Sequence, residues 1–245
     1  IGARGGSGYS GGSGGPGGSG ASISGDFSVT PGDTLFVIVG QEGYDSNLST
    51  GGGGGASGIN YGGNPLIVAG GGGGTDFQDP NYAGLDAVTT GLGAPGNGNS
   101  MGNVLGGDGI GTIHNSNNFA WGGRGWNAGT LGSMGQNGIS NSAPTTLGTY
   151  GLGGGGGAVG MGYCNCGAGG GGYSGGGAGS INNSGGGGGS YNTGINQINI
   201  AGSNYGPGYV IISYSSPNPI GCTDPLACNY DSTATCDDGS CILPD

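Results

Sequence analysis

The segment PLIVAGGGGG at residues 65–74 decides the predicted fold, because it joins a short apolar run directly to a block of glycine. The apolar half is rich in aliphatic and β-branched residues and has the length of a buried β-strand. Further apolar segments occur at 34–39 and 195–200, and further glycine runs at 51–55, 153–157 and 185–189. The recurrence of both features predicts an ordered protein with unusual backbone packing.

Glycine makes up 74 of the 245 residues, a composition typical of collagen or of disordered chains. Collagen needs glycine at every third position together with abundant proline. Here the glycines come in runs, and there are only 11 prolines. Flexible linkers are the alternative interpretation of these runs, since ordering glycine costs about 0.5–1 kcal/mol more than ordering alanine. A disordered linker has no need of recurring apolar segments, so we predict that the runs are folded.

The apolar segments have the composition of strands, and none shows the 3.6-residue period of an amphipathic helix. The sequence therefore predicts an all-β fold. We expect two hairpins: residues 26–29 with 34–39 across the turn at 31–33, and residues 195–200 with 208–214 across the turn at 204–208.

Polyglycine can form a left-handed, threefold helix of the polyproline-II type, which has no internal hydrogen bonds. Its N–H and C=O groups point sideways and need partners when they are buried. Without Cβ atoms, several such helices can pack closely and bond laterally to one another. A bundle of polyglycine-II helices therefore explains why the runs recur along the chain.

The formal charge of −11, with Arg4 and Arg124 as the only strong cations, excludes several classes of partner. Nucleic acids and anionic membranes require a basic surface, which this chain lacks. No apolar run approaches the roughly 18 residues of a membrane span. The chain opens at Ile1 rather than Met, which favours a processed product or a piece of a longer protein.

No motif of the sequence predicts catalysis. His114 is the only histidine, and serines are so abundant that a serine–histidine–aspartate arrangement carries no weight. The many Gly-x-Gly-x-x-Gly matches do not follow a strand and open a helix, as a dinucleotide site requires. We therefore predict a protein that is not an enzyme.

The composition changes at residues 215–219, SSPNP, beyond which cysteines and aspartates replace the glycine runs. We predict a glycine-rich β domain at 1–214, a linker at 215–220 and a separate acidic mini-module at 221–245. Six cysteines, four of them within the last two dozen residues, are typical of disulfides formed in an oxidising compartment. The predicted location is extracellular, at the cell surface.

The first domain carries a series of motifs at 2–6, 27–43, 51–56, 65–73, 121–126 and around 164–166. In this order they resemble the extracellular glycine-rich domain of the anaplastic lymphoma kinase and leukocyte tyrosine kinase receptors, over nearly all of 1–214. The resemblance implies a tumour-necrosis-factor-like β-sandwich combined with a bundle of polyglycine-II helices. Neither a kinase domain nor a membrane span nor cytokine-binding residues can be placed, so it transfers architecture and not receptor signalling.

The tail resembles a repeat of large surface proteins of gliding and marine bacteria, which are often exported by the type IX route. The similarity covers residues 221–241, with Gly-Cys-Thr-Asp-Pro at its start and Asp-Asp-Gly-Ser-Cys at its end. The resemblance implies that Cys222 bonds Cys241 and that Cys228 bonds Cys236. Spacing alone leaves three pairings of four cysteines open.

Oxygen-bearing side chains in the tail form a candidate calcium site, because calcium takes six to eight oxygen ligands. The alternative is that these side chains form turns by bonding their own backbone. The candidate ligands are Asp224, Asn229, Asp231, Asp237 and Asp238.

Two further features are candidate sites. Cys164 and Cys166 read as a tight local disulfide, with a soft-metal site as the weaker alternative. Trp121, Arg124 and Trp126 form an aromatic–cation patch that would stack a sugar ring or anchor a protein, or would instead form a small satellite core.

Together these patterns predict a non-enzymatic surface or adhesin module of a larger exported protein. It would act as a rigid scaffold or bind a glycan or protein ligand, and its other partners would be segments of the same surface protein or fibre. A phage or virus fibre-tip receptor binder and a receptor-like ectodomain are the alternatives.

Overall fold

The computed structural model describes residues 1–8, 15–30, 32–45, 50–76, 83–97, 112–115, 118–120, 122–126, 166–180, 182–214 and 219–244. Over these ranges the chain forms two compact units, Ile1–Val210 and Ile211–Asp245. The described part is all-β and contains no helix, as predicted. Accordingly, the described residues include no helix that is long and apolar enough to cross a membrane.

The first unit contains an antiparallel sheet with the strand order β2-β3-β4-β7. A second sheet pairs β1 with β8, and β5 pairs with β6, again antiparallel. The strands are β1 (Gly20–Asp26), β2 (Leu35–Ile38), β3 (Ser57–Tyr61), β4 (Asn64–Ala69), β5 (Thr112–Asn115), β6 (Asn118–Ala120), β7 (Tyr191–Asn192) and β8 (Ile195–Asn204).

Strands β3 and β4 form a hairpin through Gly62 and Gly63, whose φ angles are 58° and 86°. Two consecutive positive φ angles define the type I′ turn, whose twist matches that of a hairpin, and glycine adopts them without steric cost. β3 itself is not among the predicted strands, because SGINY contains glycine and carries only one aliphatic side chain.

Both predicted hairpins are wrong. β2 pairs with β3, while residue 26 ends β1, whose partner is β8. β8 therefore does not pair with residues 208–214, and that segment contains no strand. Instead, the Gly208 N–H donates to the carbonyl of Gly40 at 3.1 Å. β3 and β4 pair across two residues, whereas β1 pairs with β8 and β4 pairs with β7 over long stretches of sequence.

Strand β4 occupies the centre of the first unit because both of its faces are covered. On one face Ile67 and Ala69 pack against Ala21, Ile23 and Ala87. On the other face the fully buried Val68 packs with Ala56 and Trp126, and with the partly buried Ile38, Tyr173 and Tyr191. Burial on both faces explains why PLIVA reads as a continuous apolar run.

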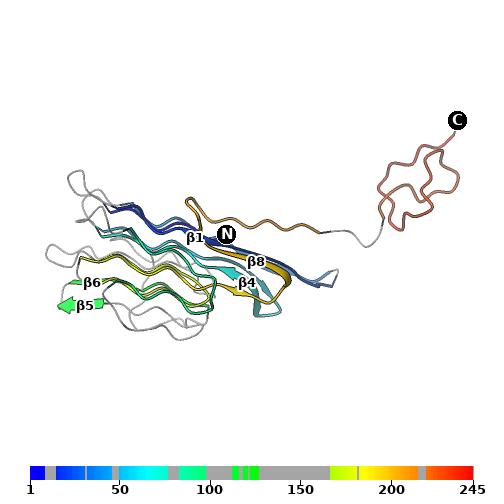
Figure 1. Ribbon diagram of the computed structural model, residues 1–245. Coiled ribbons are helices and arrows are strands. Elements are labelled where there is room, and N and C mark those ends of the chain that lie inside the picture. The colour runs from blue at the N-terminus through cyan, green and yellow to red at the C-terminus, as the bar shows by residue number, and fades with distance from the viewer. Residues whose placement is uncertain are drawn as a thin grey trace. The chain divides into compact units, whose positions relative to one another are not determined.

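The glycine segments lie side by side beyond the ends of these strands (Figure 1). Within the described residues, segment 70–75 exchanges backbone hydrogen bonds with six others: 2–6, 17–21, 50–55, 84–88, 166–172 and 184–190. These segments come from widely separated parts of the sequence. Residues 70–75 are therefore the centre of a laterally bonded bundle.

Hydrogen bonding along segment 70–75 repeats every three residues. The N–H groups of Gly71 and Gly74 both donate to segment 166–172, and those of Gly72 and Thr75 both donate to segment 2–6. The carbonyls follow the same period: those of Gly70 and Gly73 accept from segment 17–21, those of Gly71 and Gly74 from segment 184–190, and those of Gly72 and Thr75 from segment 50–55. The groups therefore point in three directions around the axis of the segment.

The bundle leaves no room for side chains at its central glycines. A Cβ atom on Gly72 would lie 1.8 Å from the carbonyl oxygen of Gly18, and one on Gly74 would lie 2.0 Å from that of Gly51. Real Cβ atoms do not approach backbone oxygens so closely, so only glycine fits these positions. The glycine runs are thus part of the packed interior.

The second unit is small and has little regular structure. Isolated parallel bridges join Ile220 to Cys236 and Cys222 to Tyr230, and a disulfide joins Cys222 to Cys241. Among the residues of this unit that the structure describes, the buried hydrophobic ones are Cys222 and Ala227. A unit of this size cannot build a sufficient core, so the disulfide has a large share in its stability.

Candidate functional site

A pocket of about 530 Å³ opens beside the β3–β4 hairpin of the first unit. Its volume lies within the range of about 300–1,000 Å³ that is usual for small-molecule sites, and its walls combine aromatic rings with polar groups. The lining side chains and backbone belong to Tyr61, Gly63, Asn64, Pro65, Leu66, Trp126, Tyr173, Tyr191 and Thr193.

The aromatic part of the wall rests on the buried core. Tyr173 and Tyr191 stack with ring centroids 4.3 Å apart and an interplanar angle of 15°. Both rings pack against the cluster of Val68 and Trp126, and Trp126 is only 5% exposed. The backbone N–H of Trp126 also donates a hydrogen bond to the carbonyl of Tyr173 at 2.9 Å. The aromatic side chains are therefore held in place before any ligand binds.

Polar groups lie around the rest of the pocket. Asn64 and Thr193 are exposed, and the Thr193 hydroxyl donates to the carbonyl of Leu66 at 2.9 Å. At the hairpin end, the Tyr61 hydroxyl donates to Asp33 at 2.5 Å. This hydrogen bond raises the pKa of Tyr61, because removing the phenolic proton would leave two anions in contact.

The predicted aromatic–cation patch is only partly tested. Trp126 belongs to the core cluster beneath the pocket, which favours the interpretation as a satellite core for this residue. Arg124 is partly buried, and its carbonyl accepts a hydrogen bond from the N–H of Gly172 at 3.1 Å. Trp121 lies outside the described residues. Sequence reasoning missed Tyr173 and Tyr191, because these residues are far from Trp126 along the chain.

The other cation, Arg4, forms a structural cluster. Its guanidinium donates to both carboxylate oxygens of Asp45, at 2.8 and 3.1 Å, and its Nε donates to Glu42 at 3.0 Å. Burial raises the pKa of Asp45, but hydrogen bonds from Arg4 and from the Ser7 N–H lower it more, so the net shift is downward. The cluster ties segments 2–6 and 40–45 together and leaves Arg4 without capacity for an anionic ligand.

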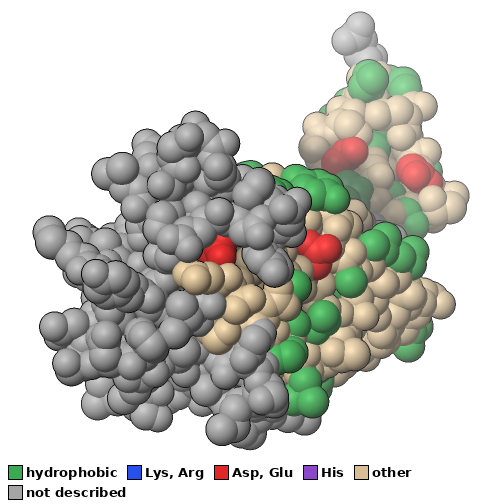
Figure 2. Space-filling model, turned by 60° about the vertical axis from the view of Figure 1, so that its left-hand side comes forward, with side chains coloured by type: hydrophobic (Ala, Val, Ile, Leu, Met, Phe, Trp, Pro, Cys, Tyr) green, Lys and Arg blue, Asp and Glu red, His purple; other side chains and the backbone are tan. Residues whose placement is uncertain are grey.

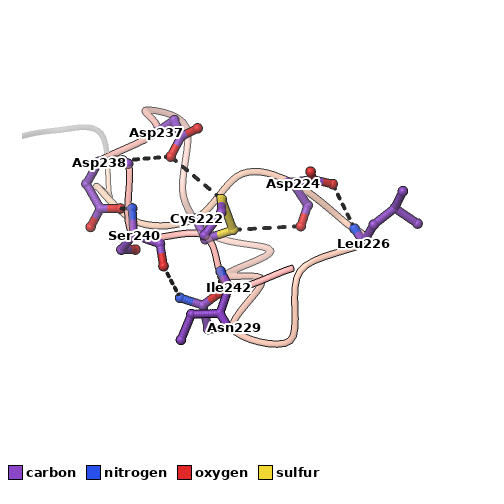
Figure 3. The surroundings of a disulfide bond; sticks show 10 residues. Cys222, Asp224, Leu226, Asn229, Asp237, Asp238, Ser240 and Ile242 are labelled. Carbon is purple, nitrogen blue, oxygen red and sulfur yellow. Dashed lines mark hydrogen bonds between the residues drawn. A yellow bond between two sulfur atoms is a disulfide. The ribbon is translucent and has the colours of Figure 1, made fainter. Parts of the chain in front are cut away.

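The five candidate calcium ligands all form hydrogen bonds within the tail, and Figure 3 shows four of them, Asp224, Asn229, Asp237 and Asp238. Four carboxylates accept from the N–H two residues later, which is the geometry of turn formation: Asp224 from Leu226, Asp231 from Thr233, Asp237 from Gly239 and Asp238 from Ser240. The pKa of Asp231 and that of Asp238 are lowered, first by hydrogen bonds with the side chains of Thr233 and Ser240 and then by those from the N–H groups of the same two residues.

Asn229 has a different role from the aspartates, since it connects two parts of the tail. Its Nδ2 donates to the Ser240 carbonyl at 2.7 Å, and its Oδ1 accepts from the Ile242 N–H at 2.8 Å. Among the residues that the structure describes, no group of three or more histidine, cysteine, aspartate or glutamate side chains could hold a metal ion. The turn-forming alternative therefore describes the four aspartates, and the calcium site stays a prediction.

Among the described cysteines, three form disulfides and two are free thiols. The disulfide between Cys222 and Cys241 is present, as the resemblance implies. Cys228 and Cys236 are exposed and free in the structure, so the inner pair stays a prediction. Cys166 is buried and disulfide-bonded, whereas Cys164 lies outside the described residues.

Comparison with known proteins adds no assignment: no protein-family model matches this sequence, and a search of the curated proteins finds no match. The geometry of each unit is therefore the basis for the proposed function.

Proposed function

We propose that this chain is a non-enzymatic module of a larger exported protein and that its first unit is a rigid extracellular scaffold. The observation that carries the proposal is the three-residue period of hydrogen bonding along segment 70–75. A threefold helix without internal hydrogen bonds presents its N–H and C=O groups in three directions, and this is the geometry of polyglycine II. We therefore take the glycine segments as polyglycine-II helices.

Lateral bonding explains how such a bundle becomes rigid. Each hydrogen bond of segment 70–75 joins it to another segment, so displacement of one segment disturbs several others. Buried backbone groups without partners are costly, by about 1–3 kcal/mol each, which opposes local opening. A flexible linker has none of these restraints. The structure thus supports a spacer or platform rather than a tether.

The tumour-necrosis-factor-like sandwich belongs to the same proposal. Its support is the contact between the two sheets, in which Ile23 of β1 packs in one cluster with Ala69 of β4 and the partly buried Ile67. Side chains from facing sheets that share a core are the mark of a sandwich.

The proposed location outside the cell is supported by the cysteines. Disulfides persist in oxidising compartments and are rare in reducing ones. The bond between Cys222 and Cys241 holds a unit that has almost no core of its own. The pronounced negative charge also suits a soluble surface protein, since net charge far from zero opposes association.

Amide hydrogen exchange tests the scaffold. In uniformly ¹⁵N-labelled protein, we expect the amides of Gly71 to Gly74 to exchange as slowly as those of the central strand β4. Gly32, exposed at a turn, is the internal reference for fast exchange. If the amides of Gly71 to Gly74 exchange as fast as that of Gly32, the runs are flexible and the scaffold proposal is wrong.

Alkylation without reductant tests the location. Protein isolated in the native state and treated with iodoacetamide should keep Cys222, Cys241 and Cys166 unmodified by mass spectrometry. Alkylation of Cys222 and Cys241 in material isolated from its native source would contradict an oxidising compartment.

A further inference from the structure

We propose that the aromatic pocket beside the β3–β4 hairpin binds a neutral sugar ring. This function goes beyond the scaffold role and does not depend on it. The pocket is lined by four aromatic residues, Tyr61, Trp126, Tyr173 and Tyr191, together with polar but uncharged groups of Asn64 and Thr193. Its volume of about 530 Å³ falls within the usual range of small-molecule sites.

The aromatic side chains supply one half of the recognition chemistry. A pyranose ring has an apolar face made of C–H groups, and it packs on the electron-rich face of an aromatic ring. Tyr191 lies on β7 and is partly buried, and its stacking partner Tyr173 is held by the core beneath it. Because the rings are already ordered, little side-chain entropy is lost when a ligand binds.

The polar groups supply the other half. An amide and a hydroxyl each donate and accept hydrogen bonds, as the hydroxyl groups of a sugar require. Asn64 carries the amide, which can donate and accept, and Thr193 carries a hydroxyl whose oxygen can accept while its proton is donated to the Leu66 carbonyl; both residues are exposed at the pocket. The only hydrogen bond that the Asn64 amide nitrogen donates within the described residues is a long one, 3.4 Å, to the Gly62 carbonyl. This side chain is therefore able to turn toward a ligand.

Charge determines the class of sugar. None of the described residues lining the pocket is charged. On the face shown in Figure 2, the described residues display carboxylates but no lysine or arginine side chain. An anionic sugar such as a uronic or sialic acid would meet no cation here and would be repelled by the net charge of −11. The proposed ligand is therefore an uncharged hexose unit.

The test is a two-dimensional NMR titration of the full chain with four neutral disaccharides: maltose, cellobiose, lactose and N,N′-diacetylchitobiose. We expect at least one of them to bind saturably, with a dissociation constant of about 1 mM or tighter. The shifted amides should be those of the pocket, including Gly63, Leu66 and Thr193. Glucuronic acid is the charged control and should not bind.

Variants assign the binding to the pocket. Tyr191→Leu should weaken it by about 3- to 10-fold, the range of one aromatic contact. Asn64→Ala should weaken it as well, and because Asn64 is exposed this variant keeps the core intact. Tyr205→Leu is the matched control, since Tyr205 is 77% exposed and does not line the pocket. A melting midpoint near that of the wild type shows that each variant is folded.

Three results would overturn the proposal. The first is that none of the disaccharides produces a saturable chemical-shift change. The second is that the shifted amides lie away from the pocket. The third is that both folded pocket variants bind as well as the Tyr205→Leu control. Each would leave the scaffold intact, because the amide exchange of the glycine bundle is measured separately.

Discussion

Replacing Gly72 by alanine should destabilise the first unit more than any other single methyl addition in segment 70–75. The new Cβ would lie 1.8 Å from the carbonyl oxygen of Gly18 and 2.3 Å from its carbonyl carbon. Both atoms belong to backbone, which cannot rotate away as a side chain would. Segment 17–21 would have to move outward by more than an ångström, against its own hydrogen bonds to Gly70 and Gly73.

The size of the effect follows from the contacts that such a movement breaks. Overpacking of a tight interior costs about 1–3 kcal/mol. Separating the segments also weakens the two hydrogen bonds from Gly18 and Ala21 to this segment, at about 1 kcal/mol each, or more if their groups stay buried without partners. The expected loss is therefore about 3–5 kcal/mol, a large part of the 5–15 kcal/mol typical of a domain.

Gly206→Ala is the matched control. The nearest atom to a Cβ at this position is 3.9 Å away, and Gly206 does not have a positive φ. Both variants restrict the unfolded chain alike, which on its own stabilises by about 0.4–1 kcal/mol. The difference between them therefore reports packing in the folded state.

Chemical unfolding followed by tryptophan fluorescence measures the two variants under the same conditions. The midpoint of Gly72→Ala should fall well below that of Gly206→Ala, with a free-energy difference of at least about 3 kcal/mol. If the two variants unfold within about 1 kcal/mol of each other, the close packing of the glycine segments is refuted.

Three further predictions concern the core, the ion pair and the tail. Val68→Ala should lower the free energy of unfolding by about 2–3 kcal/mol, because the fully buried side chain leaves a cavity; Val29→Ala, at a site 47% exposed, should change it far less. Asp45 has a lowered pKa in the folded state, so its ion pair with Arg4 stabilises the protein above the ordinary pKa of 3.8, and this contribution is lost as the pH falls through the folded pKa. Urea unfolding at pH 6 and pH 3 should therefore show a smaller decrease for Asp45→Asn than for the wild type, and equal decreases would contradict the pairing. Cys241→Ser removes the disulfide that closes a loop with a sequence separation of 19, and it should lower the stability of the tail by about 3 kcal/mol. Calorimetry should then show that the unfolding transition of the tail is lost and that of the first unit is unchanged. A retained tail transition would show that the disulfide is dispensable.

The local sequence determined some of the strands and the all-β class of the described residues. PLIVA at 65–69 forms β4, and LFVI within 34–39 forms β2, because dense aliphatic residues favour buried strands. The absence of helix follows from the abundance of glycine and the absence of a 3.6-residue apolar period. The disulfide of the tail could also be expected, since a segment too small for a core needs a crosslink.

Only the tertiary structure decided which segments are neighbours. A glycine run carries no side chains, so nothing in its sequence specifies a partner, and the runs at 51–55, 70–74 and 185–189 are nearly identical. Their order in the bundle depends on the strands that lead into them, as 65–69 of β4 leads into 70–74. The aromatic pocket depends on the same packing, because it brings Tyr61, Trp126 and Tyr191 together from three distant parts of the chain.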